Sequence, residues 1–267
     1  NGFLKPFVTA WAAAERKDSA GALTAIGGIP SASVLGNYGA EHKALIFLKL
    51  GRPAAAEPFA RRAIGTAGGR ENRLRYAFAD AYLELGDRAR ALAMIEGMSA
   101  DAGEARQRVL SGKTSGLAID TPAKAFGELL LGLAIDLNRL NNRTLPVALA
   151  QVARYAAPDN SSAAVLLGVF LEQRDRLDEA LAAFGSVGAG NGLASQARDA
   201  EARALVDAKR FDAALALARA RTEARDAGVG DSARLGNVLI SMERFDDAAA
   251  AYQRAVDLSA SQPAAER

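Results

Sequence analysis

Three alanines, Ala180, Ala214 and Ala248, stand 34 residues apart in the C-terminal half of this chain. Each has a small residue twelve positions before it and a leucine nine positions before it. Small residues at fixed offsets allow two helix axes to approach closely, and larger residues fill the space beside them. A period of this length predicts a stack of repeated helix pairs, and therefore an all-α fold.

The same phase continues towards the N-terminus. Stepping back 34 residues from Ala180 reaches Pro146, which a helix tolerates in its first turn because no backbone donor is lost there. Further upstream, Ala22 and Ala56 are again 34 residues apart, and Ala91 follows 35 residues later. We therefore expect about seven repeats.

One stretch breaks this phase. Pro146 follows Ala91 after 55 positions, one period plus 21, and the extra residues fall in an irregular insert at about 99–122. At its end, Thr121 and Pro122 predict an N-cap and a first helical position that restart the array. The insert is either a loop on the binding face or a spacer between two half-arrays.

This pattern resembles the tetratricopeptide repeat (TPR) family, whose repeat is 34 residues long. The resemblance implies a right-handed superhelical solenoid of antiparallel helix hairpins. We expect a single solenoid over 1–267, with N-terminal repeats at 1–98, the insert at 99–122 and C-terminal repeats at 123–267. The alanine-, arginine- and leucine-rich composition is also similar to that of large exported TPR proteins of alphaproteobacteria, which implies a role in the bacterial envelope.

Charge does not favour a nucleic-acid partner. The 33 basic and 31 acidic residues are interspersed, and the net charge is only +2. Five arginines do gather around one turn between repeats, and we expect them to be solvated, as charge clusters usually are. The residues of this cluster are Arg61, Arg62, Arg70, Arg73 and Arg75. The chain has no stretch of 18 apolar residues, so we expect no membrane-spanning helix.

The sequence contains no recognisable set of catalytic residues. The chain has no cysteine and a single histidine, His42, which we expect to be exposed or to line the groove. The residues from Ser111 to Thr114 resemble a phosphate-binding loop, but they follow a predicted helix where a strand is required. Asn142 and Asn160 open formal glycosylation sequons, and we interpret both as helix caps. We therefore expect no catalytic residue, no cofactor, no metal site and no enzymatic activity.

Family resemblance also implies where a partner would bind. In TPR proteins the first helix of each repeat lines the concave face. The matching positions here are Glu41, Leu45, Tyr76, Asp80, Leu131, Ile135, Asn138, Val165, Val169, Glu172, Arg203 and Asn237. The middle of this set is apolar, which indicates that something covers it. The strip is covered either by a partner, as an amphipathic helix or an extended segment, or by the neighbouring repeats or a self-associating copy of the chain.

We therefore expect a non-catalytic scaffold that binds a protein or peptide partner in the concave groove, in envelope assembly or secretion. The alternatives are a regulatory or recruitment module of a larger enzyme or complex, and a self-assembling structural solenoid, so a homo-oligomer is possible. Because the chain opens with Asn1 inside an expected helix, we interpret it as a fragment or processed product. The compartment is either periplasmic or cytoplasmic, with the first favoured.

Overall fold

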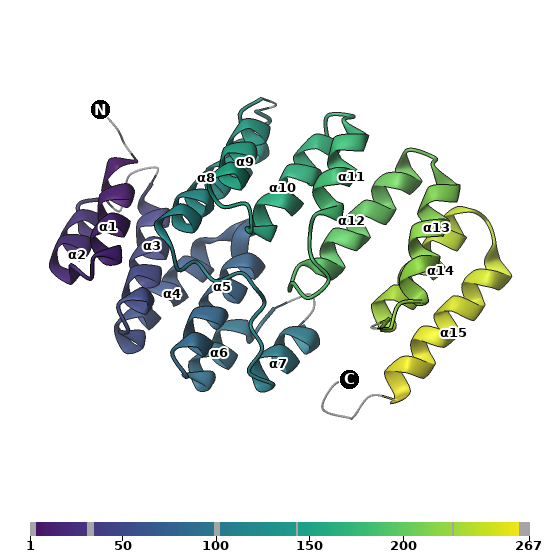
Figure 1. Ribbon diagram of the computed structural model, residues 1–267, viewed down its shortest axis with the longest axis horizontal. Coiled ribbons are helices and arrows are strands. Elements are labelled where there is room, and N and C mark those ends of the chain that lie inside the picture. Colours follow the sequence, from purple (N-terminus) through teal and green to yellow (C-terminus); the bar gives the residue numbers. More distant parts are fainter. Residues whose placement is uncertain (1–3, 31–34, 99–101, 143, 226, 262–267) are drawn as a thin grey trace. The chain divides into compact units, whose positions relative to one another are not determined.

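A computed structural model describes residues 4–30, 35–98, 102–142, 144–225 and 227–261 (Figure 1). These residues form fifteen α-helices and one short 3-10 helix, with no strand among them. The elements are α1 (Lys5–Glu15), α2 (Ser19–Gly27), α3 (Gly36–Lys49), α4 (Pro53–Thr66), η1 (Gly68–Arg70), α5 (Glu71–Glu84), α6 (Arg88–Ile95), α7 (Ala102–Leu110), α8 (Pro122–Arg139), α9 (Leu145–Ala156), α10 (Ser161–Glu172), α11 (Leu177–Gly185), α12 (Ala194–Asp207), α13 (Phe211–Thr222), α14 (Val229–Ser241) and α15 (Phe245–Ser261). The expected all-α fold of helix hairpins is confirmed.

Fourteen of these helices form seven hairpins, from α1/α2 to α14/α15, and α7 belongs to none of them (Figure 1). The alanines that set the phase all lie in second helices, as the 34-residue period predicts. Pro146 occupies the first turn of α9, where its missing N–H costs nothing. The expectation of about seven repeats is confirmed.

Every hairpin turn contains one residue in the left-handed conformation, five positions before the alanine or proline that marks the repeat. The seven residues are Lys17, Gly51, Gly86, Asn141, Asp175, Lys209 and Glu243, with φ between 57° and 76°. At the α12/α13 turn, Lys209 N donates to Val206 O and Arg210 N to Leu205 O, both at 2.8 Å. This pair of bonds is a Schellman motif, which satisfies carbonyls at the end of the first helix.

The insert is an incomplete repeat. Helix α7 packs against both α5 and α6, as α5 itself packs against α3 and α4. It ends in the same kind of turn, with Gly112 at φ 70° and Lys113 N donating to Arg108 O at 2.8 Å. No second helix follows this turn. Residues 113–120, which we call the strap, run instead to the start of α8 (Figure 1).

The chain divides into two compact units. Unit 1 comprises Asn1–Leu167 with Gly190–Gly192, and unit 2 comprises Gly168–Ala189 with Leu193–Arg267. This boundary passes through α10, inside the stretch 123–267 that we expected to be continuous. The single solenoid stays a prediction.

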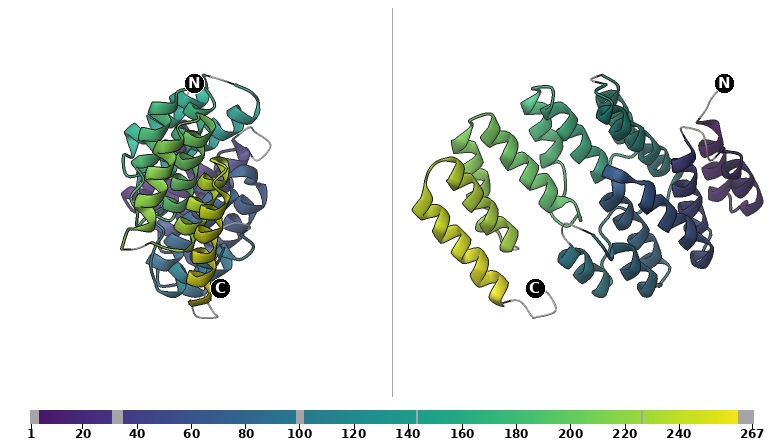
Figure 2. Two further views of the ribbon diagram at one scale, coloured as in Figure 1. Left: turned by 90° about the vertical axis from the view of Figure 1, so that its right-hand side faces the viewer. Right: turned by 180° about the vertical axis from the view of Figure 1, so that it is seen from behind.

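In unit 1, helix α8 turns back onto the N-terminal repeats. It packs against α1, α3 and η1 as well as against its own hairpin partner α9 (Figure 2). Its start is fixed as expected, because the Thr121 side chain accepts from Lys124 N at 3.2 Å and Pro122 opens the helix. The first-helix side of the N-terminal repeats is therefore covered by a later part of the same chain.

In unit 2, small residues allow the hairpins to close. A Cβ atom on Gly168 would lie 2.4 Å from Cε1 of Phe184, and one on Gly236 would lie 2.7 Å from Cε1 of Tyr252. Both glycines therefore leave room for an aromatic ring on the second helix. Around the α14/α15 hairpin, the core is built mainly from alanine and leucine of α12 to α15.

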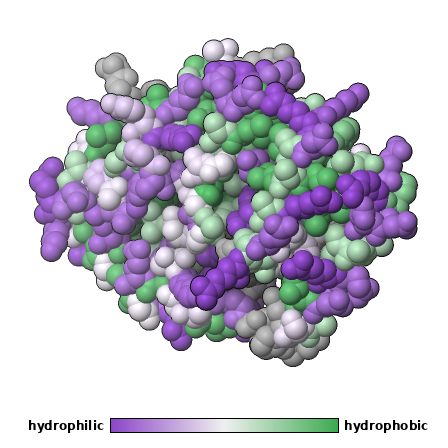
Figure 3. Space-filling model, turned by 45° about the vertical axis from the view of Figure 1, so that its right-hand side comes forward, coloured by the Kyte–Doolittle hydropathy of each residue, from purple (hydrophilic) through white to green (hydrophobic). Residues whose placement is uncertain are grey.

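On the face shown in Figure 3, hydrophobic residues form small groups separated by hydrophilic ones. Within the described part of the chain, no helix combines the length and the apolar character needed to cross a bilayer.

Candidate partner-binding surfaces

The first groove residue of unit 1, Glu41, is completely buried in the structure. Its carboxylate pairs with Arg70, with Nη1 and Oε2 2.5 Å apart. The Arg70 guanidinium also lies over the ring of Tyr38, 4.6 Å from its centroid. We expected a solvated arginine cluster here, and for Arg70 and Arg73 this expectation is wrong, because buried acidic residues pair with both.

Helix α8 supplies the partner of Arg73. Glu128 is buried and lies 2.7 Å from the Arg73 guanidinium. Burial raises the pKa of Glu128 to about 7; Arg73 opposes this shift and the nearby Glu41 adds to it. About two turns further along α8, Asp136 accepts a hydrogen bond from the hydroxyl of Tyr38. These polar pairs fasten α8 to the N-terminal repeats.

His42 is buried as well, so the expectation of an exposed or groove-lining imidazole is wrong. Trp11 Nε1 donates to His42 Nδ1 at 2.9 Å, and the Phe7 ring meets the imidazole edge-on at 4.9 Å. Burial lowers the pKa of His42 to about 4, so the imidazole is neutral at pH 7. A contact between residues 31 positions apart leaves no local signal in the sequence.

Most other groove residues of unit 1 are also covered. Leu45, Tyr76, Leu131 and Val165 are buried, while Ile135 and Asn138 on α8 are half-buried. The apolar strip that indicated a covering partner is thus covered in large part within this chain.

Asp80 is buried beneath the strap. Its Oδ1 accepts from Ser115 N at 2.7 Å, and its Oδ2 accepts from Ser115 Oγ at 2.7 Å and Leu117 N at 2.8 Å. Burial raises the pKa of Asp80, and the hydrogen bonds from the strap oppose the shift. The insert therefore occupies the groove position of α5.

Unit 2 presents its groove residues differently. Arg203 and Asn237 are exposed, and Val169 and Glu172 are half-buried. Arg203 Nη2 lies 3.3 Å from Glu172 Oε2, and the Arg203 side chain keeps 55% of its surface exposed. Asn237 Oδ1 accepts from the Tyr252 hydroxyl at 2.6 Å. Their helices α12 and α14 pack side by side, so both residues lie on adjacent first helices.

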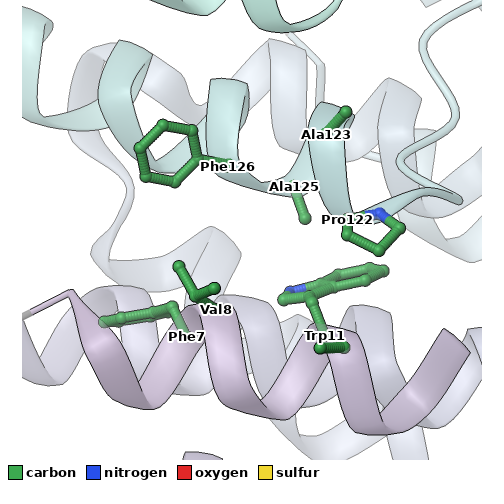
Figure 4. Close-up of a pocket in the computed structure, with 8 residues that line it drawn as sticks. Phe7, Val8, Trp11, Pro122, Ala123, Ala125 and Phe126 are labelled. Carbon is green, nitrogen blue, oxygen red and sulfur yellow. The ribbon is translucent and has the colours of Figure 1, made fainter.

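An apolar pocket of about 380 Å³ lies between α1 and α8 in unit 1. Phe7, Val8 and Trp11 line it from α1, and Pro122 and Phe126 line it from α8 (Figure 4). No pattern in the sequence indicates this pocket, because the two helices are more than 100 residues apart in the chain.

The remaining motifs are structural. Asn142 Oδ1 accepts from Leu145 N at 3.1 Å and Asn160 Oδ1 from Ala163 N at 3.2 Å, so both asparagines cap helices as predicted. The segment beginning at Ser111 follows helix α7, whereas a phosphate-binding loop of this kind follows a strand. Among the residues that the structure describes, no three acidic or histidine side chains gather as metal ligands would.

Comparison with known proteins gives one sequence match and several structural ones. Residues 233–262 match the family model described as "Tetratricopeptide repeat". No curated protein sequence matches the chain.

Three solved structures illustrate the structural similarity. MamA from AMB-1 is 18% identical, with a TM-score of 0.37, over 72% of this chain and 94% of that one. A tetratricopeptide repeat protein from Parabacteroides merdae is 13% identical, with a TM-score of 0.38, over 95% and 92%. The TPR2AB domain of yeast Sti1, in its pHSP90 complex, is 13% identical, with a TM-score of 0.34, over 94% and 97%. At these identities and TM-scores, the three similarities do not bear on what this chain binds.

Proposed function

We propose that the chain is a non-catalytic scaffold that holds a partner protein, a function that the match of residues 233–262 to the tetratricopeptide repeat model supports. In this proposal a peptide segment or helix of the partner lies along the first helices of unit 2. The observation that carries the proposal is the contrast between the units. Most groove residues of unit 1 are buried, whereas Arg203 and Asn237 are exposed on neighbouring helices.

The chemistry of this surface fits a partner with an acidic group beside an apolar one. Arg203 forms an ion pair with Glu172 in which the arginine stays largely exposed, and pairs near the surface contribute about 0–1 kcal/mol. A carboxylate of the partner can therefore replace Glu172 at little cost. On α14, one turn beyond Asn237, Ile240 is 44% exposed and offers an apolar contact.

We propose to test envelope assembly or secretion first, because the composition of the chain is similar to that of exported bacterial proteins. Photo-crosslinking in cells locates the partner on the surface. A benzophenone amino acid is placed at Asn237 or Arg203, and matched controls carry it at Ala216 of α13 and Ala249 of α15, both exposed on second helices. We expect one protein to crosslink at the first-helix positions and not at the controls.

Two further results sharpen this test. Arg203→Glu is expected to reduce the yield of the same crosslinked protein at position 237, because it repels an acidic partner. Equal crosslinking at all four positions, or none at the first-helix positions, would overturn the proposed surface. A crosslink between two copies of this chain would point instead to self-assembly.

A further inference from the structure

The strap is buried although it has no regular secondary structure. Ser115, Leu117 and Ile119 are all buried within unit 1, whereas Lys113 and Thr114 before them are exposed. A segment that only connects two helices is expected to run over the surface, where water satisfies its backbone. Alternate buried side chains on a segment without regular secondary structure are instead typical of a peptide held in a binding site.

The acceptor for this segment is Asp80. An ionised carboxylate offers only acceptor sites, and both oxygens of Asp80 are used by donors of the strap. Two of these donors are the backbone N–H groups on either side of Gly116, whose φ of 76° bends the segment, and the third is the serine hydroxyl. Hydrogen bonds to a charged acceptor are stronger than neutral ones. Recognition therefore depends on a serine hydroxyl and on a leucine two residues later.

The other side of the strap is closed by Gly190–Gly192. Gly192 N donates to Ser115 O at 2.7 Å, and Arg108 Nη1 donates to Gly190 O at 3.2 Å. A Cβ atom at position 192 would lie 2.7 Å from Ser115 Cβ, so only glycine allows this approach. At the end of the strap, Lys49 Nζ donates to Asp120 O at 2.6 Å. The strap thus lies between α5 and a segment from a later turn.

We propose that the face of α5 around Asp80 is a binding site for a segment with a Ser-Gly-Leu pattern, in which the glycine allows the bend seen at Gly116, and that the strap fills this site in cis. The strap is an autoinhibitory ligand: a partner segment with the same pattern binds unit 1 only after the strap leaves. This inference concerns unit 1 and does not depend on the function proposed for unit 2.

Hydrogen exchange tests whether the hydrogen bonds to Asp80 keep the strap in place. In Asp80→Asn, one oxygen is replaced by an amide donor, which faces the N–H of Leu117 or Ser115. We expect the amides of residues 115 and 117 to exchange about 10- to 100-fold faster than in the unaltered chain. Glu84→Gln removes the same charge one turn along α5, from an exposed residue, and is expected to leave these amides unchanged. Unprotected amides in the unaltered chain, or equal exchange in both variants, would overturn the proposal.

A peptide probe tests the site itself. The probe is a labelled peptide of residues 113–121, and its control has alanine at the serine and aspartate at the leucine. We expect the probe to bind a full-length chain whose strap is displaced by Leu117→Asp, and to bind the unaltered chain far more weakly. Adding Asp80→Asn to the displaced chain is expected to weaken binding about 10-fold or more.

Circular dichroism first checks that the displaced chain keeps its helices. If Leu117→Asp does not fold, Gly192→Ala takes its place, since the added methyl pushes on Ser115 from outside the site. The proposal is wrong if a folded chain with a displaced strap does not bind the probe, or binds the control peptide equally well. Either result would show that the face of α5 around Asp80 is not a peptide-binding site.

Discussion

Glu128 and His42 are buried titratable residues whose pKa values shift in opposite directions. Burial raises the pKa of Glu128 from 4.5 to about 7 and lowers that of His42 from 6.5 to about 4. From pH 4.5 to 7 the folded chain keeps a proton on Glu128 that the unfolded chain has lost, so this group makes stability fall as pH rises. From pH 4 to 6.5 the unfolded chain binds a proton that His42 in the folded chain does not, so His42 makes stability rise with pH.

These two contributions nearly cancel between pH 4.5 and 6.5, and removing one of them exposes the other. We predict that Glu128→Gln makes the free energy of unfolding rise with pH in this window, by up to about 1.4 kcal/mol per pH unit. Glutamine keeps an acceptor for Arg73 but no longer titrates. Denaturant titrations at a series of pH values check this.

The control for that measurement is Glu96→Gln, which removes a carboxylate from an exposed position. Its pH profile is expected to stay close to that of the unaltered chain. If Glu128→Gln also follows the unaltered profile, the opposing contributions assigned to Glu128 and His42 are wrong.

At the scale of the element, the hairpin turn is the feature that repeats most strictly. All seven turns place one residue in the left-handed region, yet only Gly51 and Gly86 among them are glycines. A residue with a Cβ atom pays about 1–2 kcal/mol for this conformation, because the Cβ crowds the following carbonyl.

We predict that Lys209→Gly stabilises the α12/α13 hairpin by about 1 kcal/mol, since φ at this position is 58°. The reverse change, Gly86→Ala at φ 76°, is expected to destabilise α5/α6 by a similar amount. Chemical denaturation measures both. Lys209→Ala separates the backbone effect from loss of the lysine side chain, and it should leave stability nearly unchanged.

Much of the arrangement of helices was predictable, because hairpins depend on local contacts that recur with the period. The small residues at Gly168 and Gly236 and the N-cap at Thr121 are such local features. The return of α8 onto α1 and α3 was not predictable. It depends on contacts such as Glu128 with Arg73, 55 residues apart, which nothing in the repeat phase encodes.

The same reason explains the outcome for the groove. Family resemblance selects Glu41 and Asp80 correctly as first-helix residues, but periodicity does not reveal which later segment covers them. The incomplete repeat in the insert was also not predictable from the period. Helix α7 ends in the turn of a repeat, but the second helix that would have continued the 34-residue phase is missing. Only in three dimensions does the insert become an incomplete repeat followed by the strap.

At the scale of the whole molecule, the two compact units each have a core of their own. Leu129 is completely buried in unit 1, and Leu239 belongs to the core of unit 2. We predict two calorimetric unfolding transitions, one for each unit. Leu129→Ala is expected to lower the free energy of unfolding of unit 1, and Leu239→Ala that of unit 2, each by about 2–5 kcal/mol. If both substitutions shift one common transition equally, the units unfold together.

Gly190–Gly192 belongs to unit 1 although it follows part of unit 2 in the chain. During synthesis, residues 1–167 therefore emerge first, and the segment that closes the strap emerges 25 residues later. At about 5–20 residues per second, this interval lasts about 1–5 s. During this interval Asp80 is available to hold the nascent strap on one side, but Gly190–Gly192 does not yet cover the other side. The N-terminal unit completes its assembly only when a turn of a later repeat has left the ribosome.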